Sequence, residues 1–252
     1  MNRQIKDFVR LAADTLELPE PIYEFGSRQM PGQELYANLR PLFKEKEYVG
    51  ADYIDGPGVD LVLDLRSIDL PDNSVGSALC MEVIEHVNEP FTAMNELYRV
   101  LKPGGVLVMS APMNLEIHGS PYDYWRFTPE GFKELTKEFE FSFIGYCGDE
   151  RFPSNVVCIG VKEATVDTGS FLIQYKAWNS RWSRKNKLYH AFRVLKEKMS
   201  PYLPAIMSNS AYELWVRNSE IKHHPKYKNF LYLLIPSKIL ILYKKLKKSN
   251  NE

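Results

Sequence analysis

The feature that most constrains the fold is the stretch 77–112, in which two short apolar runs flank one helical pattern. The runs are Ala78–Met81 and Val106–Met109, and short continuous apolar runs of this kind are typical of buried strands. Between them, residues 90–101 carry apolar side chains at helical spacing, followed by a Pro-Gly-Gly turn. This order predicts a right-handed βαβ crossover, in which ligands bind beyond the carboxyl ends of the parallel strands.

Polar residues that follow these strands should therefore gather at one edge of the sheet. Glu82, Glu85 and His86 come directly after the first strand, and Pro112 ends the second. We expect all four to face one crevice.

Composition allows a sizeable folded core but divides the chain by charge. The 252 residues are 44% hydrophobic and have a formal net charge of zero. Residues 1–170 nevertheless hold 15 Lys and Arg against 28 Asp and Glu, whereas residues 171–252 hold 17 against 4. We expect the two parts to have different partners or to attract one another.

The three cysteines form no CxxC pair and no zinc-binding spacing. Cys80, Cys147 and Cys158 lie in apolar or strand-like contexts, so the sequence predicts buried free thiols and no metal site. Residues 1–21 contain acids and no continuous apolar segment, which argues against a secretory signal. Both observations favour a cytoplasmic location.

One run of residues carries a family resemblance. The sequence CMEVIEHV…EP…AMNELYRVLKPGGVLVMSAP resembles the fourth-to-fifth-strand region of class I S-adenosylmethionine-dependent methyltransferases, and the resemblance extends roughly from Ile22 to Val161. It implies an α/β, doubly wound, mostly parallel seven-stranded sheet that closes with a hairpin. It also implies S-adenosylmethionine as cofactor of a domain spanning 1–165. For residues 166–252, aromatic and aliphatic side chains among Arg and Lys predict a basic, mainly helical extension.

The family's first motif is incomplete in this chain. A strand is predicted over Ile22–Gly26, but the glycine places of GxGxG become Gly26, Arg28 and Met30. The resemblance implies that Gly26 allows close approach to the methionine part of the cofactor. It further implies that Glu24 accepts a hydrogen bond from the cofactor's ammonium group or an ordered water, with Ser27 beside it. Alternatively, Gly26 simply ends a strand.

Two further acids follow predicted strands. Asp52 ends the strand predicted over 47–52, where a carboxylate can accept both hydroxyls of a ribose, although nicotinamide-dependent proteins use the same chemistry. A solvated strand-end acid is the alternative. The resemblance places Asp64, after a strand predicted over 59–64, at the adenine amino group, with Leu65 over the ring. It adds three more residues to the cofactor site: Tyr53, Met81 and Glu82.

The segment 112–129 is rich in aromatic and turn residues and should cover the crevice. Its sequence HGSPYDYWRFT resembles the acceptor-side loop of a bacterial methyltransferase subgroup. Because the histidine pKa lies near neutrality, His118 is the first candidate for a general base and His86 the second. The alternative is a capped start of the helix after Thr128, with structural histidines and with Trp125 as packing.

The last part of the chain matches no motif. The apolar segment 230–243 is interrupted and too short to span a bilayer, and a lysine cluster follows it at 244–248. This pattern fits peripheral contact with an anionic membrane surface, and equally a helix packed on the acidic domain. No nucleic-acid-binding motif accompanies the positive charge.

These patterns favour one function over two rivals. The first is methyl transfer to an acceptor that is a small molecule or a hydroxyl of an envelope glycan or lipid-linked intermediate. A second interpretation is a non-catalytic scaffold with this fold in a membrane-associated biosynthetic complex. A nicotinamide-dependent oxidoreductase is the third, but its GxGxxG fingerprint is absent.

Overall fold

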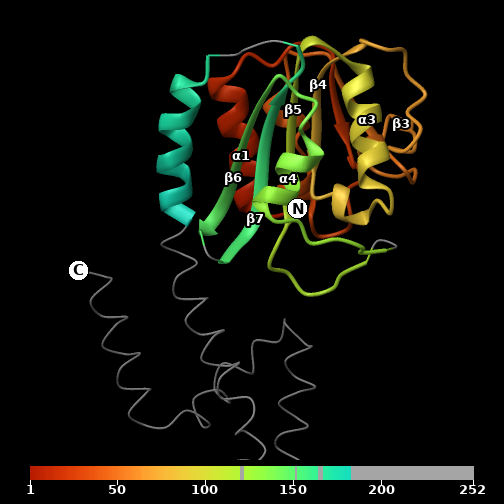
Figure 1. Cartoon of the computed structure of the whole chain (residues 1–252). Coiled ribbons are helices and arrows are strands. Elements are labelled where there is room, and N and C mark those ends of the chain that lie inside the picture. Colours follow the sequence, from red (N-terminus) through yellow and green to blue (C-terminus); the bar gives the residue numbers. More distant parts are fainter. Residues whose placement is uncertain (120–121, 151, 164–166, 183–252) are drawn as a thin grey trace, which may run out of the picture. The chain divides into compact units, whose positions relative to one another are not determined.

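A seven-stranded sheet is the centre of the computed structural model, which describes residues 1–182 apart from 120–121, 151 and 164–166 (Figure 1). The strand order is β3-β2-β1-β4-β5-β7-β6. Neighbouring strands are parallel except around β7, which is antiparallel to both β5 and β6. The predicted doubly wound sheet with a closing hairpin is therefore confirmed. The strands are β1 (Ile22–Phe25), β2 (Tyr48–Asp52), β3 (Leu61–Val62), β4 (Val75–Met81), β5 (Leu101–Pro112), β6 (Phe141–Asp149) and β7 (Phe152–Val161).

Helices cover both faces of this sheet (Figure 1). On one face, α1 and a helix over 169–182 share a core with side chains of β4, β5 and β7. On the other face, α3 and α4 pack against the alternate residues of the same strands. The helices are α1 (Arg3–Thr15), α2 (Glu34–Ala37), α3 (Pro90–Val100) and α4 (Pro129–Leu135), with short 3-10 helices η1 (Arg40–Leu42) and η2 (Ile84–His86).

Local sequence explains where the helices begin. The Asn2 side chain accepts hydrogen bonds from the first free N–H groups of α1, and the Thr128 side chain accepts from Gly131 N–H at the start of α4. Pro90 and Pro129 stand at the first positions of α3 and α4, where a proline loses no hydrogen bond. The predicted capped start of α4 is thus confirmed.

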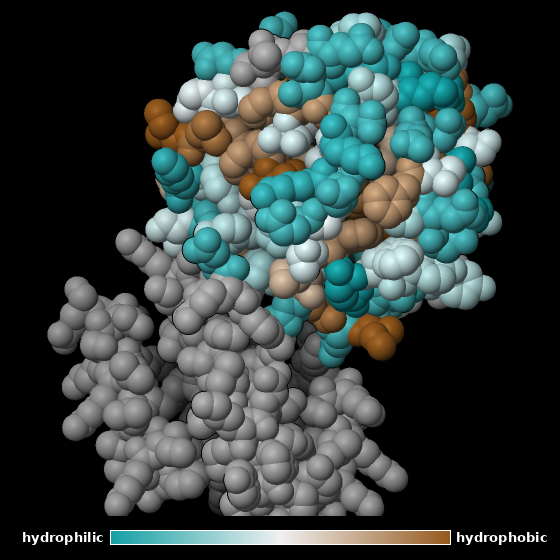
Figure 2. Space-filling view, viewed as in Figure 1, coloured by the Kyte–Doolittle hydropathy of each residue, from teal (hydrophilic) through white to brown (hydrophobic). Residues whose placement is uncertain are grey.

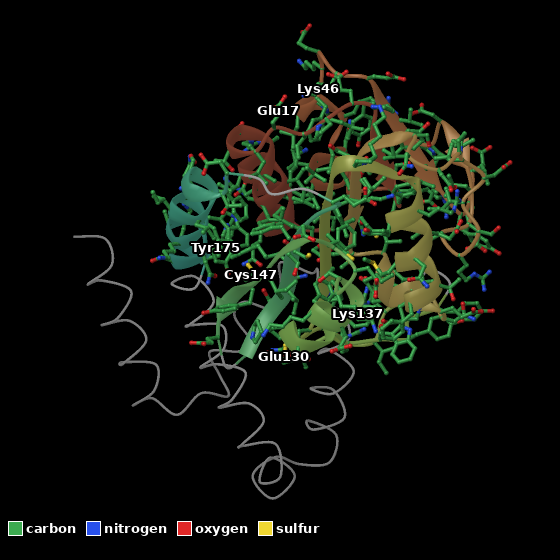
Figure 3. All side chains as sticks on the ribbon, turned by 45° about the horizontal axis from the view of Figure 1, so that its top comes forward. Glu17, Lys46, Glu130, Lys137, Cys147 and Tyr175 are labelled. Carbon is green, nitrogen blue, oxygen red and sulfur yellow. The ribbon has the colours of Figure 1, made fainter. Side chains whose placement is uncertain are left out.

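The helix over 169–182 docks on α1 and β6 through aromatic rings. The ring centroids of Phe8 and Trp178 lie 5.4 Å apart, and those of Phe143 and Tyr175 lie 4.8 Å apart. The Tyr175 hydroxyl donates to the Tyr146 carbonyl of β6 at 2.9 Å, and Figure 3 shows Tyr175 near Cys147 of the same strand. The helix over 169–182 therefore packs on the domain, although it follows the predicted domain boundary at residue 165. The boundary residue itself is not among the described residues.

Two elements differ from the sequence prediction. The third strand has only two residues. Before it, Asp60 is bonded to Gly50 through both its backbone N–H and its side chain, and after it Asp64 forms an isolated bridge with Ser67. The predicted Pro-Gly-Gly turn is a bulge within β5. There the pairing with β4 moves from Val75↔Leu101 to Ser77↔Val106, so residues 102–105 loop out.

The structure also bears on the predictions for the cysteines and for membrane contact. All three cysteines are free and buried, as predicted. Among the described residues, no helix combines the length and apolar character needed to cross a membrane. The predicted membrane-contacting segment 230–248 lies outside the described residues. Figure 2 shows a mostly hydrophilic surface on this side of the described unit, with smaller apolar areas between the polar groups.

Candidate cofactor and acceptor site

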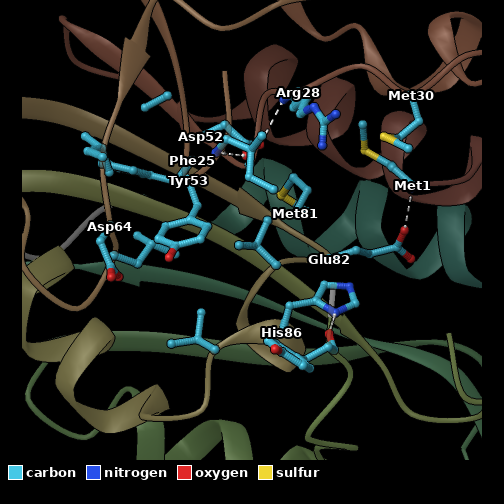
Figure 4. Close-up of a pocket in the computed structure, with 18 of the residues that line it drawn as sticks. Met1, Phe25, Arg28, Met30, Asp52, Tyr53, Asp64, Met81, Glu82 and His86 are labelled. Atoms are coloured by element: carbon cyan, nitrogen blue, oxygen red, sulfur yellow. Dashed lines mark hydrogen bonds and ion pairs between the residues drawn. The ribbon is translucent and has the colours of Figure 1, made fainter. Parts of the chain in front are cut away.

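A cavity of about 450 Å³ opens at the carboxyl ends of the parallel strands, where the sequence predicted a ligand site (Figure 4). Its wall comes from the ends of β1, β2 and β4, the turn after β3, η2 and the described residues of the loop that contains His118 and Tyr122. The predicted site residues that line it are Gly26, Asp52, Tyr53, Asp64, Leu65, Met81, Glu82, His86 and His118.

Gly26 forms the tightest part of this wall. Its φ angle is +88°, and a Cβ atom added there would meet Val83 Cγ2 at 2.1 Å. Its N–H donates to the Ala51 carbonyl at 2.8 Å, which ties the end of β1 to β2. A side chain would therefore strain the backbone and push Val83 toward the cavity.

Asp52 is held rigidly at the end of β2. One carboxylate oxygen accepts from Arg28 N–H and the other from Ile54 N–H, each at 3.0 Å. Each carboxylate oxygen has a further lone pair, so the group can still accept from a ligand in the cavity. Figure 4 shows Asp52 beside Arg28 and Phe25 in this wall.

Asp64 is paired with Arg66, a partner that the sequence analysis did not identify. The guanidinium of Arg66 donates to Asp64 Oδ2 at 2.6 Å and also reaches Asn88 Oδ1 at 3.0 Å. The hydrogen bond from Arg66 holds the pKa of Asp64 below its usual range. The adjacent Leu65 is buried against the core and presents an apolar surface to the cavity.

Glu82 has the least common backbone conformation in the wall. Its φ angle of +56° turns the side chain away from the line of β4, between Asn155 and the chain's first residue. Oε1 accepts from Asn155 Nδ2 at 2.8 Å, and Oε2 lies 3.1 Å from the Met1 amine.

Two predicted cofactor residues do not line the cavity. Glu24 is buried inside the sheet and accepts a hydrogen bond from the Tyr48 hydroxyl. Burial raises the pKa of Glu24 to about 7, against the opposing effect of that hydrogen bond. Ser27 is also buried, with its Oγ packed close to Gly50. Both residues support the wall from behind.

The two predicted histidines lie together at the cavity. Their ring centroids are 5.0 Å apart, at an interplanar angle of 78°. His86 Nδ1 lies 2.5 Å from the Tyr122 carbonyl, and His118 Nδ1 lies 3.2 Å from Asp123 Oδ2. Both neighbours of Nδ1 are oxygens that can accept, which favours a tautomer with the proton on Nδ1 and a lone pair on Nε2. Burial lowers the pKa of His86.

Asp123 connects the second histidine to the loop. Its carboxylate accepts from His118 N–H at 2.8 Å and from two guanidinium nitrogens of Arg126. The Arg126 guanidinium holds the pKa of Asp123 well below its usual range. Asp123 is thus an anchored anion that orients His118.

The expectation that Glu85 and Pro112 face the crevice is wrong. Both are buried and absent from the cavity wall. Glu85 lies in η2, where its carbonyl accepts from Tyr124 and Trp125 N–H and so fixes the aromatic segment. Its side chain is 0% exposed, and burial raises its pKa well above the usual range.

Several wall residues were missed by the sequence analysis. They come from loops that the fold brings in from distant positions, and only the aromatic content of 112–129 indicated any of them. These residues include Arg28, Arg66, Asn88, Tyr122 and Tyr124.

The residues present fit S-adenosylmethionine. The cavity volume lies within the range of roughly 300–1,000 Å³ that is usual for small-ligand sites. Asp52, Asp64 and Glu82, the carboxylate wall of this site, provide acceptors for hydroxyl and amine groups, and Gly26 leaves room beside them. His86 and His118, the histidine wall, add nitrogen bases to the same cavity.

Comparison with known proteins identifies relatives of part of the chain. Residues 37–109 match the family described as a methyltransferase domain. An uncharacterized methyltransferase of Mycobacterium bovis is 33% identical over 75 residues, which is 30% of each chain. A Mycolicibacterium smegmatis protein named "probable S-adenosylmethionine-dependent methyltransferase" is 31% identical over 101 residues, or 36% of this chain and 37% of that one. The chain thus spans about a third of the length of these two curated relatives, 30% and 37%.

Solved structures agree at the level of the fold. A SAM-dependent methyltransferase from Archaeoglobus fulgidus superposes with a TM-score of 0.51 at 14% identity, covering 63% of this chain and 93% of that one. Residues 37–109 are thus similar to a methyltransferase domain, and the strand order and the superposition show the fold of class I S-adenosylmethionine-dependent methyltransferases.

Proposed function

We propose that this protein transfers a methyl group from S-adenosylmethionine to a hydroxyl of an acceptor that enters beside the histidine wall. One observation carries the proposal: the carboxylate wall and the histidine wall share a single cavity at the carboxyl edge of the sheet. A donor bound along the first wall would therefore lie next to groups able to act on an acceptor.

The carboxylate wall has a defined task for each side chain. Asp52 would hold the ribose hydroxyls, and Asp64 with Leu65 would hold the adenine, beside the exposed ring of Tyr53. Glu82 would hold the ammonium group, with Met81 below it and Gly26 leaving space. S-adenosylmethionine supplies an activated sulfonium methyl, so these residues chiefly bind and orient.

The histidine wall would act on the acceptor. Asp123 orients His118, and the Tyr122 carbonyl orients His86. In the transfer, the acceptor oxygen forms a bond to the methyl carbon while the carbon–sulfur bond breaks and sulfur keeps its electron pair. The hydroxyl proton must leave, and His118 is our first candidate for promoting that loss, with His86 second.

We propose a sugar hydroxyl of an envelope glycan or lipid-linked intermediate as the acceptor, ahead of other small molecules and of nucleic acid. Exposed rings beside the cavity support this choice, because aromatic faces stack well on flat apolar surfaces such as sugar rings. Tyr122 is 62% exposed, Tyr124 47% and Trp125 41%. An apolar hollow lined by Phe91, Trp125 and Phe127 shares Asn88 with the main cavity and extends this surface.

Calorimetric titration tests the donor half of the proposal. The full chain should bind S-adenosylmethionine and S-adenosylhomocysteine at one site and should not bind NAD. Binding of NAD alone would favour an oxidoreductase, and binding of none of the three would favour the non-catalytic scaffold.

A transfer assay tests the acceptor half. With donor labelled in its methyl group, label should pass to lipid-linked or free glycans and not to RNA or DNA. Label on nucleic acid only would contradict the proposed acceptor class.

The proposed location is cytoplasmic, with peripheral contact to the inner membrane face through the basic extension. The sequence supports it: lysines near an anionic surface contribute roughly 1 kcal/mol each. The full chain should sediment with anionic vesicles and not with neutral ones. A variant with alanine at Lys244, Lys245, Lys247 and Lys248 should lose most of this binding, and unchanged sedimentation would contradict membrane contact through the lysines.

A further inference from the structure

The strongest unassigned feature is a buried carboxyl group without a partner. Glu85 is 0% exposed, and neither of its carboxylate oxygens makes a hydrogen bond in the described structure. A buried polar side chain in this state is destabilising unless an ion or another ligand completes it. His86 Nε2 lies 3.7 Å from Glu85 Oε1, beyond hydrogen-bond distance but close enough for an ion pair.

Two histidines, His86 and His118, lie close to this carboxyl group. One ligand atom each from Glu85, His86 and His118 lie within 4.8 Å of one another. His86 and His118 also line the cavity, whereas Glu85 lies behind them. Two imidazoles and one carboxylate on one side of an ion, with the remaining positions facing a cavity, form a common ligand set for divalent first-row transition metals.

The groups around these ligands are those that metal sites require. Metal-bound histidines almost always donate their second ring N–H to a carboxylate or carbonyl, which fixes the ring and the tautomer. Here His86 Nδ1 lies 2.5 Å from the Tyr122 carbonyl, and His118 Nδ1 lies 3.4 Å from the Glu116 carbonyl and 3.2 Å from Asp123 Oδ2. Asp123 is itself held by Arg126. The outer hydrogen bonds thus leave an Nε2 lone pair on each ring for an ion.

We propose that Glu85, His86 and His118 bind one divalent transition-metal ion, of the class of Zn²⁺ or Co²⁺, at the edge of the cavity. Ligand atoms around such an ion lie roughly 3.3 Å apart when the bonds are about 2.0–2.1 Å. The side chains must therefore close by about 1.5 Å from their widest separation, which side-chain rotation of the half-buried His118 can supply.

The metal site adds to the proposed function. Metal binding itself does not depend on that function, but the role of the ion in methyl transfer does. A divalent ion beside the acceptor would bind the hydroxyl oxygen and lower its pKa, so the proton could pass to solvent. The two histidines would then act through the ion. The sequence predicted no metal site because the ligands come from two distant segments, and no regular spacing connects Glu85-His86 with His118.

Titration of the metal-free full chain with CoCl₂ tests the site without any assay of methyl transfer. Treatment with a chelator followed by desalting should give protein that binds one Co²⁺ with ligand-field absorption in the visible range, and ZnCl₂ should displace it. Glu85→Gln and His118→Ala should each weaken this binding by about 100-fold or more. Asp123→Asn, which changes only the orienting group, should weaken it roughly 10–100-fold.

A matched control comes from the other histidine pair in the chain. A variant with alanine at His223 and His224, which lie outside the described residues, should keep the visible spectrum and the affinity. Loss of Co²⁺ binding in this control with retention in His118→Ala would overturn the site, as would the absence of saturable Co²⁺ binding in the wild type. Because His118 is partly exposed, its variant should fold even where Glu85→Gln does not, and circular dichroism checks this.

Calorimetry with S-adenosylhomocysteine separates this proposal from the proposed function. Chain that binds S-adenosylhomocysteine and no Co²⁺ would overturn the metal site alone. Chain that binds Co²⁺ and no S-adenosylhomocysteine would overturn the donor site and leave the metal site supported.

Discussion

The carboxylate wall and the histidine wall are built by different parts of the fold. Asp52 and Glu82 stand directly at the ends of β2 and β4, so sheet register fixes their positions. His118 stands on a long loop and is fixed by hydrogen bonds to Asp123, which is paired in turn with Arg126. Asp52 and Glu82 are therefore positioned mainly by the sheet, whereas Asp64 and His118 depend on contacts with side chains of nearby loops.

The largest effect should come from the histidine wall. With an acceptor identified, His118→Ala should lower turnover by roughly 10²–10⁴-fold, because the imidazole that promotes loss of the acceptor's hydroxyl proton is removed. Affinity for S-adenosylhomocysteine should stay near wild type. The control Ile117→Ala, at the neighbouring residue that is 90% exposed, should change neither quantity. Parallel loss of turnover and donor affinity would show that the two walls are not separable.

The next effect concerns the tight turn behind the carboxylate wall. Gly26→Ala should lower the free energy of unfolding by roughly 2–5 kcal/mol, since it adds a left-handed backbone penalty and an overlap with Val83. Gly104→Ala is the matched control, because its φ is also positive, at +77°, and nothing lies within 4 Å of the added Cβ. Denaturant unfolding of both variants separates the two contributions. Equal losses would remove the argument for steric contact at Gly26.

A third effect tests Glu24 as a support within the sheet. Its pKa in the folded state is about 7, above the ordinary value of 4.5, so the folded protein binds its proton more tightly than the unfolded chain. Stability from this group is present below pH 4.5 and falls as the pH rises toward 7, by about 3 kcal/mol in total. Glu24→Gln should remove that part of the decline. Parallel stability profiles of wild type and variant between pH 4.5 and 7 would contradict it.

The smallest effect concerns donor affinity alone. Asp52→Ala should weaken S-adenosylhomocysteine binding by about 1–3 kcal/mol, because the ribose hydroxyls lose their acceptor. Asp55→Ala provides a control in the same loop, since Asp55 accepts only from Gly56 N–H and does not line the cavity. Calorimetry should place the control at wild-type affinity. Equal affinity of both variants would remove Asp52 from the site.

The sequence predicted the sheet better than the site, for physical reasons. Buried strands and proline-started helices leave strong local patterns, so β4, α3, β5 and the closing hairpin were found with small errors at their ends. The positions of Asp52 and Glu82 at the cavity could also be predicted, because each residue stands at the end of a strand. The resemblance also assigned Glu24 to the cofactor. A shift of one residue along a strand moves a side chain to the other face of the sheet, and in the structure the Glu24 side chain is buried against Tyr48 and does not line the cavity.

Contacts between distant segments left no comparable pattern. The pairing of Asp64 with Arg66 and the approach of His118 to His86 depend on how the loops fold over the sheet. The buried Glu85 shows the same limit, since its place after β4 predicted exposure at the crevice. In the structure, η2 turns this carboxyl group beneath the histidines.

The most direct test of the account is a crystal structure of the full chain with S-adenosylhomocysteine. The ligand should lie in the cavity, with its ribose hydroxyls at Asp52, its amine at Glu82 and its sulfur toward the histidine wall. A ligand bound elsewhere, or one whose sulfur faces away from His86 and His118, would contradict the claim that the two walls serve one transfer.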